Sequence, residues 1–229
     1  MRTIVVGDTH GCYNELKTLI ESLEKKGEYN KKRDKLIFLG DYIDRGTDSR
    51  LVIKYIRNLQ KNNKNVIALK GNHEDMLLDY YNNINEYWLW NGASETKKSY
   101  EGFNKQFNED MEWMKTLPLY HEDKHFIYVH AGIDASKPMK KQDKETLLWI
   151  REPFIYNNKK YNKKVIFGHT PTLSINRDDK PISTFADHIG IDTGCVYGGS
   201  LTALIIEGGE IKSFYQVEKM TEQKNKKNA

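Results

Sequence analysis

The sequence has few cysteines, and they are not paired in a C-x-x-C motif. Its 229 residues include two, Cys12 and Cys195, which lie far apart along the chain. Two cysteines cannot build the kind of disulfide framework that stabilises small secreted domains. The chain therefore does not belong to that class, and its composition fits a reducing compartment.

Long apolar runs are also missing. Near the amino terminus, only Ile4–Val6 forms an uninterrupted apolar stretch, which is too short for the apolar core of a signal peptide. No segment approaches the roughly 20 apolar residues that are needed to cross a bilayer. We therefore expect a cytoplasmic protein that has no membrane partner.

The charge balance gives little reason to expect a nucleic-acid ligand. The formal net charge is +4, from 36 Lys and Arg against 32 Asp and Glu. Most of the excess lies in residues 219–229, which hold four lysines and one glutamate. A weak excess at a terminus is typical of a solvated tail. A chain of this length can form one domain with a large core, so we predict a catalytic domain over 1–218, a flexible basic tail over 219–229, and a monomer by default.

The first third of the chain alternates short β-branched runs with amphipathic patterns. Strands are expected at Thr3–Val6, Leu36–Leu39 and Val66–Leu69. Between them, leucine and isoleucine recur at i, i+3, i+4 and i+7 over residues 16–23, and a similar apolar face runs over 51–59. This β-α-β-α-β order predicts parallel strands joined by right-handed crossovers.

The remainder of the chain is less regular. Residues 87–113 are aromatic and polar with weak periodicity, which indicates helices and loops over the edge of the sheet. Trp88 and Trp90 in this segment are expected to pack in or beside the core rather than to line a substrate groove. Gly208-Gly209 predicts a hairpin turn. Further strands are expected at Phe126–Val129, Val165–Phe167, Ile189–Ile191, Leu201–Glu207 and Ile211–Val217.

Residues of the metal-ligand type follow five of the predicted strands. In chain order they form GDTHG at 7–11, GDYIDRG at 40–46, GNHE at 71–74, HAG at 130–132 and GHT at 168–170. Ligands bind at the carboxyl ends of strands in open α/β sheets. Carboxylate and amide oxygens with neutral imidazoles suit Mn, Fe or Zn, and one carboxylate can bridge two ions ~3.5–4 Å apart. The pattern therefore predicts a dinuclear site that activates water and holds a phosphoryl oxygen.

Each of these elements alone is weak evidence. A single Asp-x-His sequence is more often an ordinary loop pair, and a single buried histidine is more often structural than a ligand. Five such elements, each at the end of a predicted strand, are hard to obtain by chance. Their combination favours the metal site.

The first three elements resemble the signature motifs GDxHG, GDxxDRG and GNHE of the PPP-family protein phosphatases, which belong to the calcineurin-like metallophosphoesterases. The match is residue for residue, and the resemblance extends roughly from Thr3 to Val217. Segments at 90–92, 96–100, 147–151 and 192–199 are similar to the compact bacterial and phage branch. The resemblance implies an α/β fold in which two mixed β-sheets, built around the βαβαβ core, pack as a sandwich flanked by helices.

The resemblance also implies a set of metal ligands. Two divalent ions are expected, with Mn²⁺ favoured and Fe or Zn as alternatives. One ion would be held by Asp8, His10 and Asp41, and the other by Asp41, Asn72, His130 and His169, so that Asp41 bridges the pair.

Further residues are implied to act on the phosphate ester. His73 would be the general acid, and Asp44 would orient it. Arg45 and Arg151 would bind phosphate oxygens, with Asn72 beside them, and metal-bound hydroxide would attack phosphorus without a phosphoenzyme. These roles are chemically sensible, because an alkoxide is a poor leaving group for which a positioned acid is worth ~10²–10⁴ in rate. The arginine fork matches the geometry of phosphoryl oxygens.

Three functions are compatible with these residues. The favoured one is a serine/threonine protein phosphatase, with small phosphate esters as alternative substrates. The second is a symmetrical dinucleoside tetraphosphate hydrolase, since that family shares most motifs, including the Asp-Thr-Gly-Cys at 192–195. Asp44 and Glu74 favour the phosphatase, because the dinucleotide enzymes tend to lack the first acid and to carry Asp in place of the second. A catalytically inactive binding module is disfavoured, because every inferred ligand and the acid are present.

Overall fold

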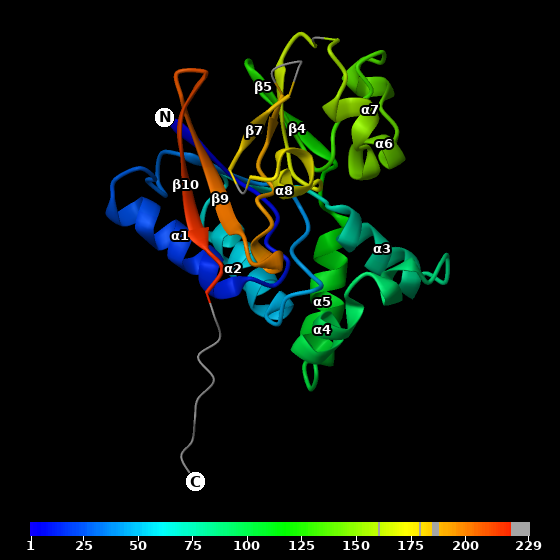
Figure 1. The fold of residues 1–229 in the computed structure, drawn as a ribbon. Coiled ribbons are helices and arrows are strands. Elements are labelled where there is room, and N and C mark those ends of the chain that lie inside the picture. Colours follow the sequence, from blue (N-terminus) through cyan, green and yellow to red (C-terminus); the bar gives the residue numbers. More distant parts are fainter. Residues whose placement is uncertain (160, 179, 185–187, 221–229) are drawn as a thin grey trace.

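Two five-stranded mixed sheets pack face to face, with helices on both outer sides (Figure 1). The computed structural model describes residues 1–159, 161–178, 180–184 and 188–220. The strand order is β10-β9-β1-β2-β3 in one sheet and β4-β5-β6-β8-β7 in the other. This architecture confirms the α/β sandwich predicted from the sequence.

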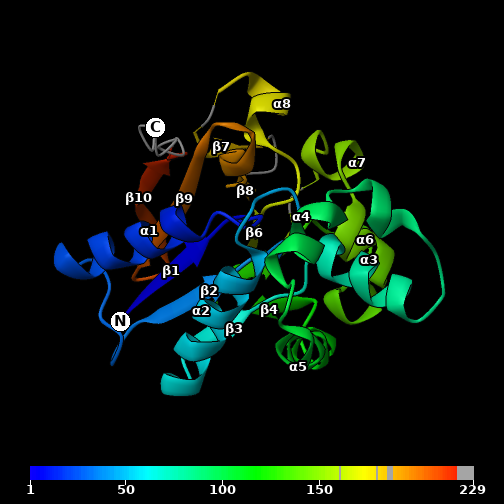
Figure 2. The same ribbon diagram turned by 90° about the horizontal axis from the view of Figure 1, so that it is seen from below.

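The first sheet contains the predicted β-α-β-α-β unit. β1 (Arg2–Val6) pairs in parallel with β2 (Lys35–Phe38), which pairs in parallel with β3 (Val66–Ala68). The crossover helices α1 (Tyr13–Lys25) and α2 (Ser49–Asn62) lie next to each other against one face of this sheet (Figure 2). The carboxyl ends of the three parallel strands therefore meet at one edge.

A long hairpin extends the first sheet on the other side of β1. β9 (Ser200–Glu207) pairs antiparallel with both β1 and β10 (Glu210–Glu218). Gly208 and Gly209 form its turn with φ values of 65° and 81°. Both central residues of such a two-residue turn need a positive φ, which glycine adopts without steric cost.

The second sheet is shorter and only partly evident in the sequence. β5, β6 and β8 run parallel, while β4 and β7 pair antiparallel at the two edges. The edge strands were not predicted, because strands this short show no alternation of apolar and polar residues. The bounds are β4 (Tyr120–Glu122), β5 (Phe126–Val129), β6 (Lys164–Phe167), β7 (Ile182–Ser183) and β8 (Ile189–Gly190).

Helices account for most of the middle of the chain, including the aromatic segment 87–113. Among the described residues, none of the helices has both the length and the apolar character needed to cross a bilayer. The bounds are α3 (Asn72–Tyr81), η1 (Tyr87–Trp90), α4 (Ala93–Ser99), α5 (Asn104–Lys115), η2 (Met139–Lys141), α6 (Lys144–Trp149), α7 (Glu152–Ile155), α8 (Thr172–Asn176) and η3 (Cys195–Tyr197).

Alternation along the strands divides the core into three layers. In β1, Ile4 packs under α1 and α2, while Val5 points between the two sheets. In β5, Tyr128 meets Val5 between the sheets, and Ile127 points to the opposite side, toward α6 and α7. Since successive residues of a strand face opposite sides, a fully apolar strand contributes side chains to two layers of the core.

The predicted boundary between the domain and the tail stays a prediction. β10 ends at Glu218, and the next two residues still contact α1. Lys219 Nζ lies 3.1 Å from Glu15 Oε1, and the Met220 amide donates to the same oxygen at 2.8 Å. The rest of the predicted tail lies outside the described residues.

Candidate active site

The residues singled out in the sequence gather where the parallel strands of both sheets end. Bonds between distant loops hold them together: the His169 amide donates to Asp8 Oδ2 (2.9 Å), and the His73 amide donates to Asp41 Oδ1 (3.0 Å). All of the predicted metal ligands are buried, namely Asp8, His10, Asp41, Asn72, His130 and His169. Their role as ligands stays a prediction.

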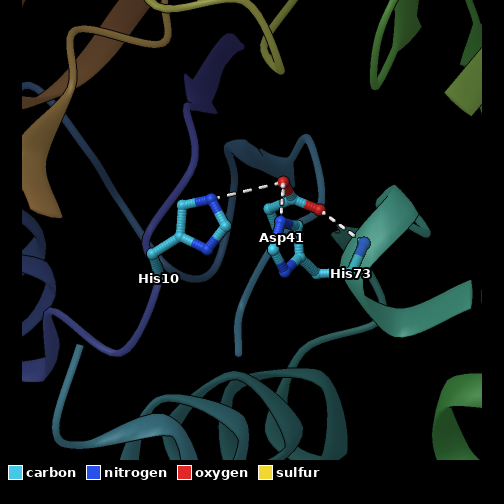
Figure 3. A group of neighbouring side chains, drawn as sticks. All are labelled: His10, Asp41 and His73. Atoms are coloured by element: carbon cyan, nitrogen blue, oxygen red, sulfur yellow. Dashed lines mark hydrogen bonds and ion pairs between the residues drawn. The ribbon is translucent and has the colours of Figure 1, made fainter. Parts of the chain in front are cut away.

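Asp41 lies at the centre of the cluster (Figure 3). Its Oδ2 is 3.3 Å from His10 Nε2 and 3.9 Å from His73 Nε2, and its Oδ1 is 3.4 Å from His130 Nε2. The ligand-type atoms of His10, Asp41 and His73 lie within 4.8 Å of one another, and those of Asp41, His130 and His169 form a second such group. Asp41 belongs to both groups, as expected of a carboxylate that bridges two ions.

Backbone carbonyls fix the orientation of two imidazoles. His10 Nδ1 lies 2.8 Å from the Ile43 carbonyl oxygen, and His130 Nδ1 lies 3.0 Å from that of Leu39. Each Nδ1–H therefore donates to a carbonyl, which leaves the Nε2 lone pair directed at Asp41. Metal-ligating imidazoles are held in this way. Burial lowers the pKa of His130 to about 4, so its ring is neutral at physiological pH.

Several buried polar atoms lack suitable partners within the protein. Asp8 Oδ1 and His169 Nε2 accept or donate no hydrogen bond among the described residues. Asn72 Oδ1 lies 2.9 Å from His130 Nε2, whose lone pair faces it, and 3.0 Å from His169 Nδ1. Two acceptors that face each other repel unless a cation lies between them. The carboxylate, amide and imidazole donors therefore fit divalent metal ions.

The carboxylates of the site also repel one another. Burial raises the pKa of Asp8 well above its usual range, and the charges of Asp192 and Asp41 raise it further. Burial likewise raises the pKa of Asp192. A bound cation would reverse this effect by stabilising the ionised forms. No role for Asp192 was predicted, although it follows the apolar run Ile189–Ile191 in the same way that Asp8 follows β1.

Gly168 leaves the space that Asp8 occupies. A methyl group on Gly168 would overlap Asp8 Oδ1. We expect Gly168→Ala to displace the carboxylate and to weaken metal binding by about tenfold or more, as happens when the support of a ligand is lost. Titration of the chelator-treated variant with Mn²⁺, with circular dichroism as the control for folding, measures the effect. An unchanged affinity in a folded variant would show that Asp8 is not a ligand.

Glu74 ties two site loops together. Its Oε2 accepts the amides of Asp41 and Gly71, both at 2.9 Å, and its Oε1 accepts the Tyr42 amide at 2.8 Å. Burial, followed by the nearby charge of Asp41, raises the pKa of Glu74 to about 8. The side chain therefore aligns the loop after β2 with the start of α3, which carries Asn72.

The backbone at the site is unusual. Residues other than glycine seldom adopt a positive φ, and each such case costs on the order of 1–3 kcal/mol. The surrounding bonds compensate for this cost and hold the side chains in place. The predicted site residues with such angles are His10 (39°), Asp41 (54°), Asp44 (71°), Arg45 (69°) and His169 (63°).

His73 lies between Asp41 and a second acid. His73 Nδ1–H donates to Asp44 Oδ2 at 2.7 Å, so its Nε2 faces Asp41. Burial lowers the pKa of His73, whereas the charge of Asp41 and the bond to Asp44 act in the opposite direction. The structure thus brings together the pair that the resemblance implied.

Two residues of the aromatic segment also bind Asp44. Trp88 Nε1 donates to Asp44 Oδ1 at 2.9 Å and to Oδ2 at 3.0 Å, and Thr96 Oγ1 donates to Oδ1 at 2.6 Å. Trp88 is fully buried, in line with the expected core packing, whereas Trp90 is 72% exposed. Neither bond was predicted, because no local sequence pattern connects residues so far apart.

The two arginines reach the predicted ligands from different loops. Arg45 Nη1 donates to His10 Nε2 at 2.6 Å, so its positive charge lies beside a predicted metal ligand. Arg151 Nη1 donates to the His169 carbonyl (3.2 Å) and to Thr170 Oγ1 (3.0 Å). Both guanidinium groups therefore border the cluster on which a phosphate group would be bound.

The sequence comparisons with known proteins agree on one family of phosphoesterases. A sequence model described as calcineurin-like phosphoesterase matches residues 1–200. The chain is 30% identical over 230 residues to an asymmetrical bis(5'-nucleosyl)-tetraphosphatase of Oceanobacillus iheyensis. The alignment covers 89% of this chain and 88% of that protein. Relatives from Bacillus cereus and Bacillus mycoides carry the same name.

One further relative and one protein of similar fold are named as phosphatases. The chain is 31% identical over 216 residues to serine/threonine-protein phosphatase 1 of Salmonella typhimurium, covering 89% of this chain and 91% of that one. Its fold is similar to that of a cold-active protein-tyrosine phosphatase from a psychrophilic Shewanella, with a TM-score of 0.66 and 17% identity over 92% of this chain and 76% of that one.

Proposed function

Because the chain belongs to the calcineurin-like phosphoesterase family, a family of hydrolases with a dinuclear divalent metal site, we propose that it hydrolyses the phosphomonoesters of phosphoserine and phosphothreonine proteins. The observation that supports this substrate class is the 2.7 Å bond from His73 Nδ1 to Asp44 Oδ2. Serine and threonine leave as alkoxides, which need a proton donor, and an imidazole oriented by a carboxylate is suited to that task.

In this proposal two manganese ions are bound. When bound, they supply an activated water and draw negative charge from the phosphoryl oxygens. The residues that hold them are Asp8, His10 and Asp41 for one ion, and Asp41, Asn72, His130 and His169 for the other.

The remaining side chains act on the substrate directly. Arg45 and Arg151 bind phosphoryl oxygens through their guanidinium forks. His73 holds a proton on Nε2 and transfers it to the oxygen of the leaving serine or threonine. Asp44 keeps the imidazole in the required orientation through Nδ1. Proton transfer of this kind contributes ~10²–10⁴ in rate.

The names of the tetraphosphatase relatives favour a second candidate, the asymmetrical hydrolysis of dinucleoside tetraphosphates. The alternative considered from the sequence was the symmetrical reaction, whereas these names specify the asymmetrical one. In either reaction the leaving group is the phosphate end of a nucleotide. A phosphate is already a good leaving group. Such an enzyme gains less from His73 and Asp44 than a phosphatase does.

Parallel assays distinguish the two candidates. We expect a phosphothreonine peptide to be hydrolysed with a higher kcat/KM than diadenosine tetraphosphate in the presence of Mn²⁺, by about tenfold. Phosphate release and nucleotide chromatography measure the two reactions. A reversed preference, with ATP and AMP as the products, would make the asymmetrical tetraphosphatase the correct function, and ADP alone would indicate the symmetrical one.

A further inference from the structure

We propose that Trp88 and Thr96 are positioning residues that fix the proton donor of the site through Asp44. This inference rests on the proposed role of His73. It adds residues of η1 and α4, for which no catalytic role was predicted, to those that position the proton donor; α4 is labelled in Figure 1.

The bonds around Asp44 leave its carboxylate a single orientation. Oδ1 accepts from Trp88 Nε1 (2.9 Å) and Thr96 Oγ1 (2.6 Å), while Oδ2 accepts from His73 Nδ1 (2.7 Å) and is 3.0 Å from Trp88 Nε1. All four side chains are at most 1% exposed. Rotation of the carboxylate would break a buried bond to an ionised group, and such bonds are about twice as strong as neutral ones.

Thr96 fixes the backbone of Asp44 as well as its side chain. Its Oγ1 accepts the Asp44 amide at 2.8 Å, so the hydroxyl proton is directed to the carboxylate. Asp44 has a φ of 71°, a region that residues other than glycine seldom occupy. The two bonds of the Thr96 hydroxyl, together with a 3.1 Å bond from the same amide to Ser49 Oγ, therefore stabilise Asp44 in this conformation.

Trp88 contacts Asp44 and the helix that carries His73. Its indole donates to Asp44, and its ring packs on Tyr80 and Tyr81 at centroid distances of 5.4 Å and 5.8 Å. These tyrosines belong to α3, the helix that begins at Asn72 and carries His73. A tryptophan that only filled space would need some partner for its N–H group. Here that partner is the acid that orients His73, so the indole sets the distance between the acid and the helix.

The substitutions Trp88→Phe and Thr96→Val remove one donor each and keep most of the volume. We expect each to lower kcat on a phosphothreonine peptide by about ten- to a hundredfold, with KM and metal content little changed. The loss on p-nitrophenyl phosphate should be smaller, because its leaving group barely needs a proton. Thr96→Ser keeps the hydroxyl and should recover most of the activity.

Trp113→Phe is the matched control for loss of an indole bond. Trp113 Nε1 donates to Gln60 Oε1 at 2.9 Å, and its ring packs against the same hydrophobic cluster as Trp88. This variant should lower the melting temperature without changing the ratio of the two activities. Equal losses of kcat on both substrates in Trp88→Phe and Thr96→Val, or no recovery of activity in Thr96→Ser, would show that the two residues have only structural roles.

A double-mutant cycle tests whether Trp88 acts through His73. If it does, Trp88→Phe should cause almost no further loss in the His73→Ala background, whereas additive losses would overturn the proposal. The cycle is measured on the metal-loaded enzyme with the peptide and with p-nitrophenyl phosphate. A wild-type preference for diadenosine tetraphosphate would contradict the proposed substrate class alone, since a non-additive cycle on a simple alkyl phosphate, whose leaving group needs the proton, would still support the positioning role. If Trp88→Phe does not fold, the same cycle with His73→Ala is measured with Thr96→Val instead.

Discussion

The Asp41→Asn variant is expected to lose most of its hydrolytic activity, by about a hundredfold or more. Asp41 belongs to both groups of ligand-type atoms, so an amide in its place removes the shared negative charge from both ions. Metal ions bound in such a site would supply several kcal/mol of transition-state stabilisation, and each 1.36 kcal/mol corresponds to about tenfold in rate. Turnover of p-nitrophenyl phosphate at saturating Mn²⁺, together with elemental analysis, measures the loss of activity and of bound metal.

Removal of the metal by a chelator complements the Asp41→Asn experiment, and Asp134→Asn is its matched control. The wild-type chain is expected to bind two metal ions, to lose activity in chelator and to regain it on titration with Mn²⁺. Asp134→Asn makes the same change at an acid that pairs with Ser136 and Lys137, and should retain both ions. Full activity in the metal-stripped protein would rule out the dinuclear mechanism.

The sequence predicts the fold where its elements are long enough to show a period. The helical face over residues 16–23 and the apolar run Thr3–Val6 both recur in the structure, because amphipathic burial decides their conformation. β4 and β7 were not predicted, because their own residues show little preference for a strand. Their strand conformation depends on pairing with β5 and β8.

The candidate site is predictable for a different reason. Asp8, Asp41 and His130 lie within three residues of the ends of β1, β2 and β5, and parallel strands place their carboxyl ends together, so a short motif is enough to locate them. Trp88 and Thr96 reach Asp44 through contacts between distant segments, at sequence separations of 44 and 52 residues. Such contacts depend on how η1 and α4 pack, which no local pattern records.

The His73→Ala variant is expected to lose kcat on a phosphothreonine peptide by ~10²-fold or more, since it lacks the proton donor for the leaving alkoxide. The loss should be smaller on p-nitrophenyl phosphate, whose phenolate leaves readily. Metal content should be unchanged. This last measurement matters, because the ring atoms of His73 lie within the same 4.8 Å group as those of His10 and Asp41, and proximity alone is compatible with a ligand.

The neighbouring His10 provides the comparison that separates an acid from a ligand. The two rings meet edge to face with centroids 4.6 Å apart, and both direct Nε2 at Asp41. They differ in the partner of Nδ1, which is the Ile43 carbonyl for His10 and the Asp44 carboxylate for His73. Either acceptor stabilises a protonated ring, but the Asp44 carboxylate does so more strongly because it is charged, which suits an acid. The Ile43 carbonyl fixes the tautomer in which Nε2 can bind a metal. His10→Ala should therefore lose metal and impair both substrates alike, and the same result for His73→Ala would make His73 a ligand.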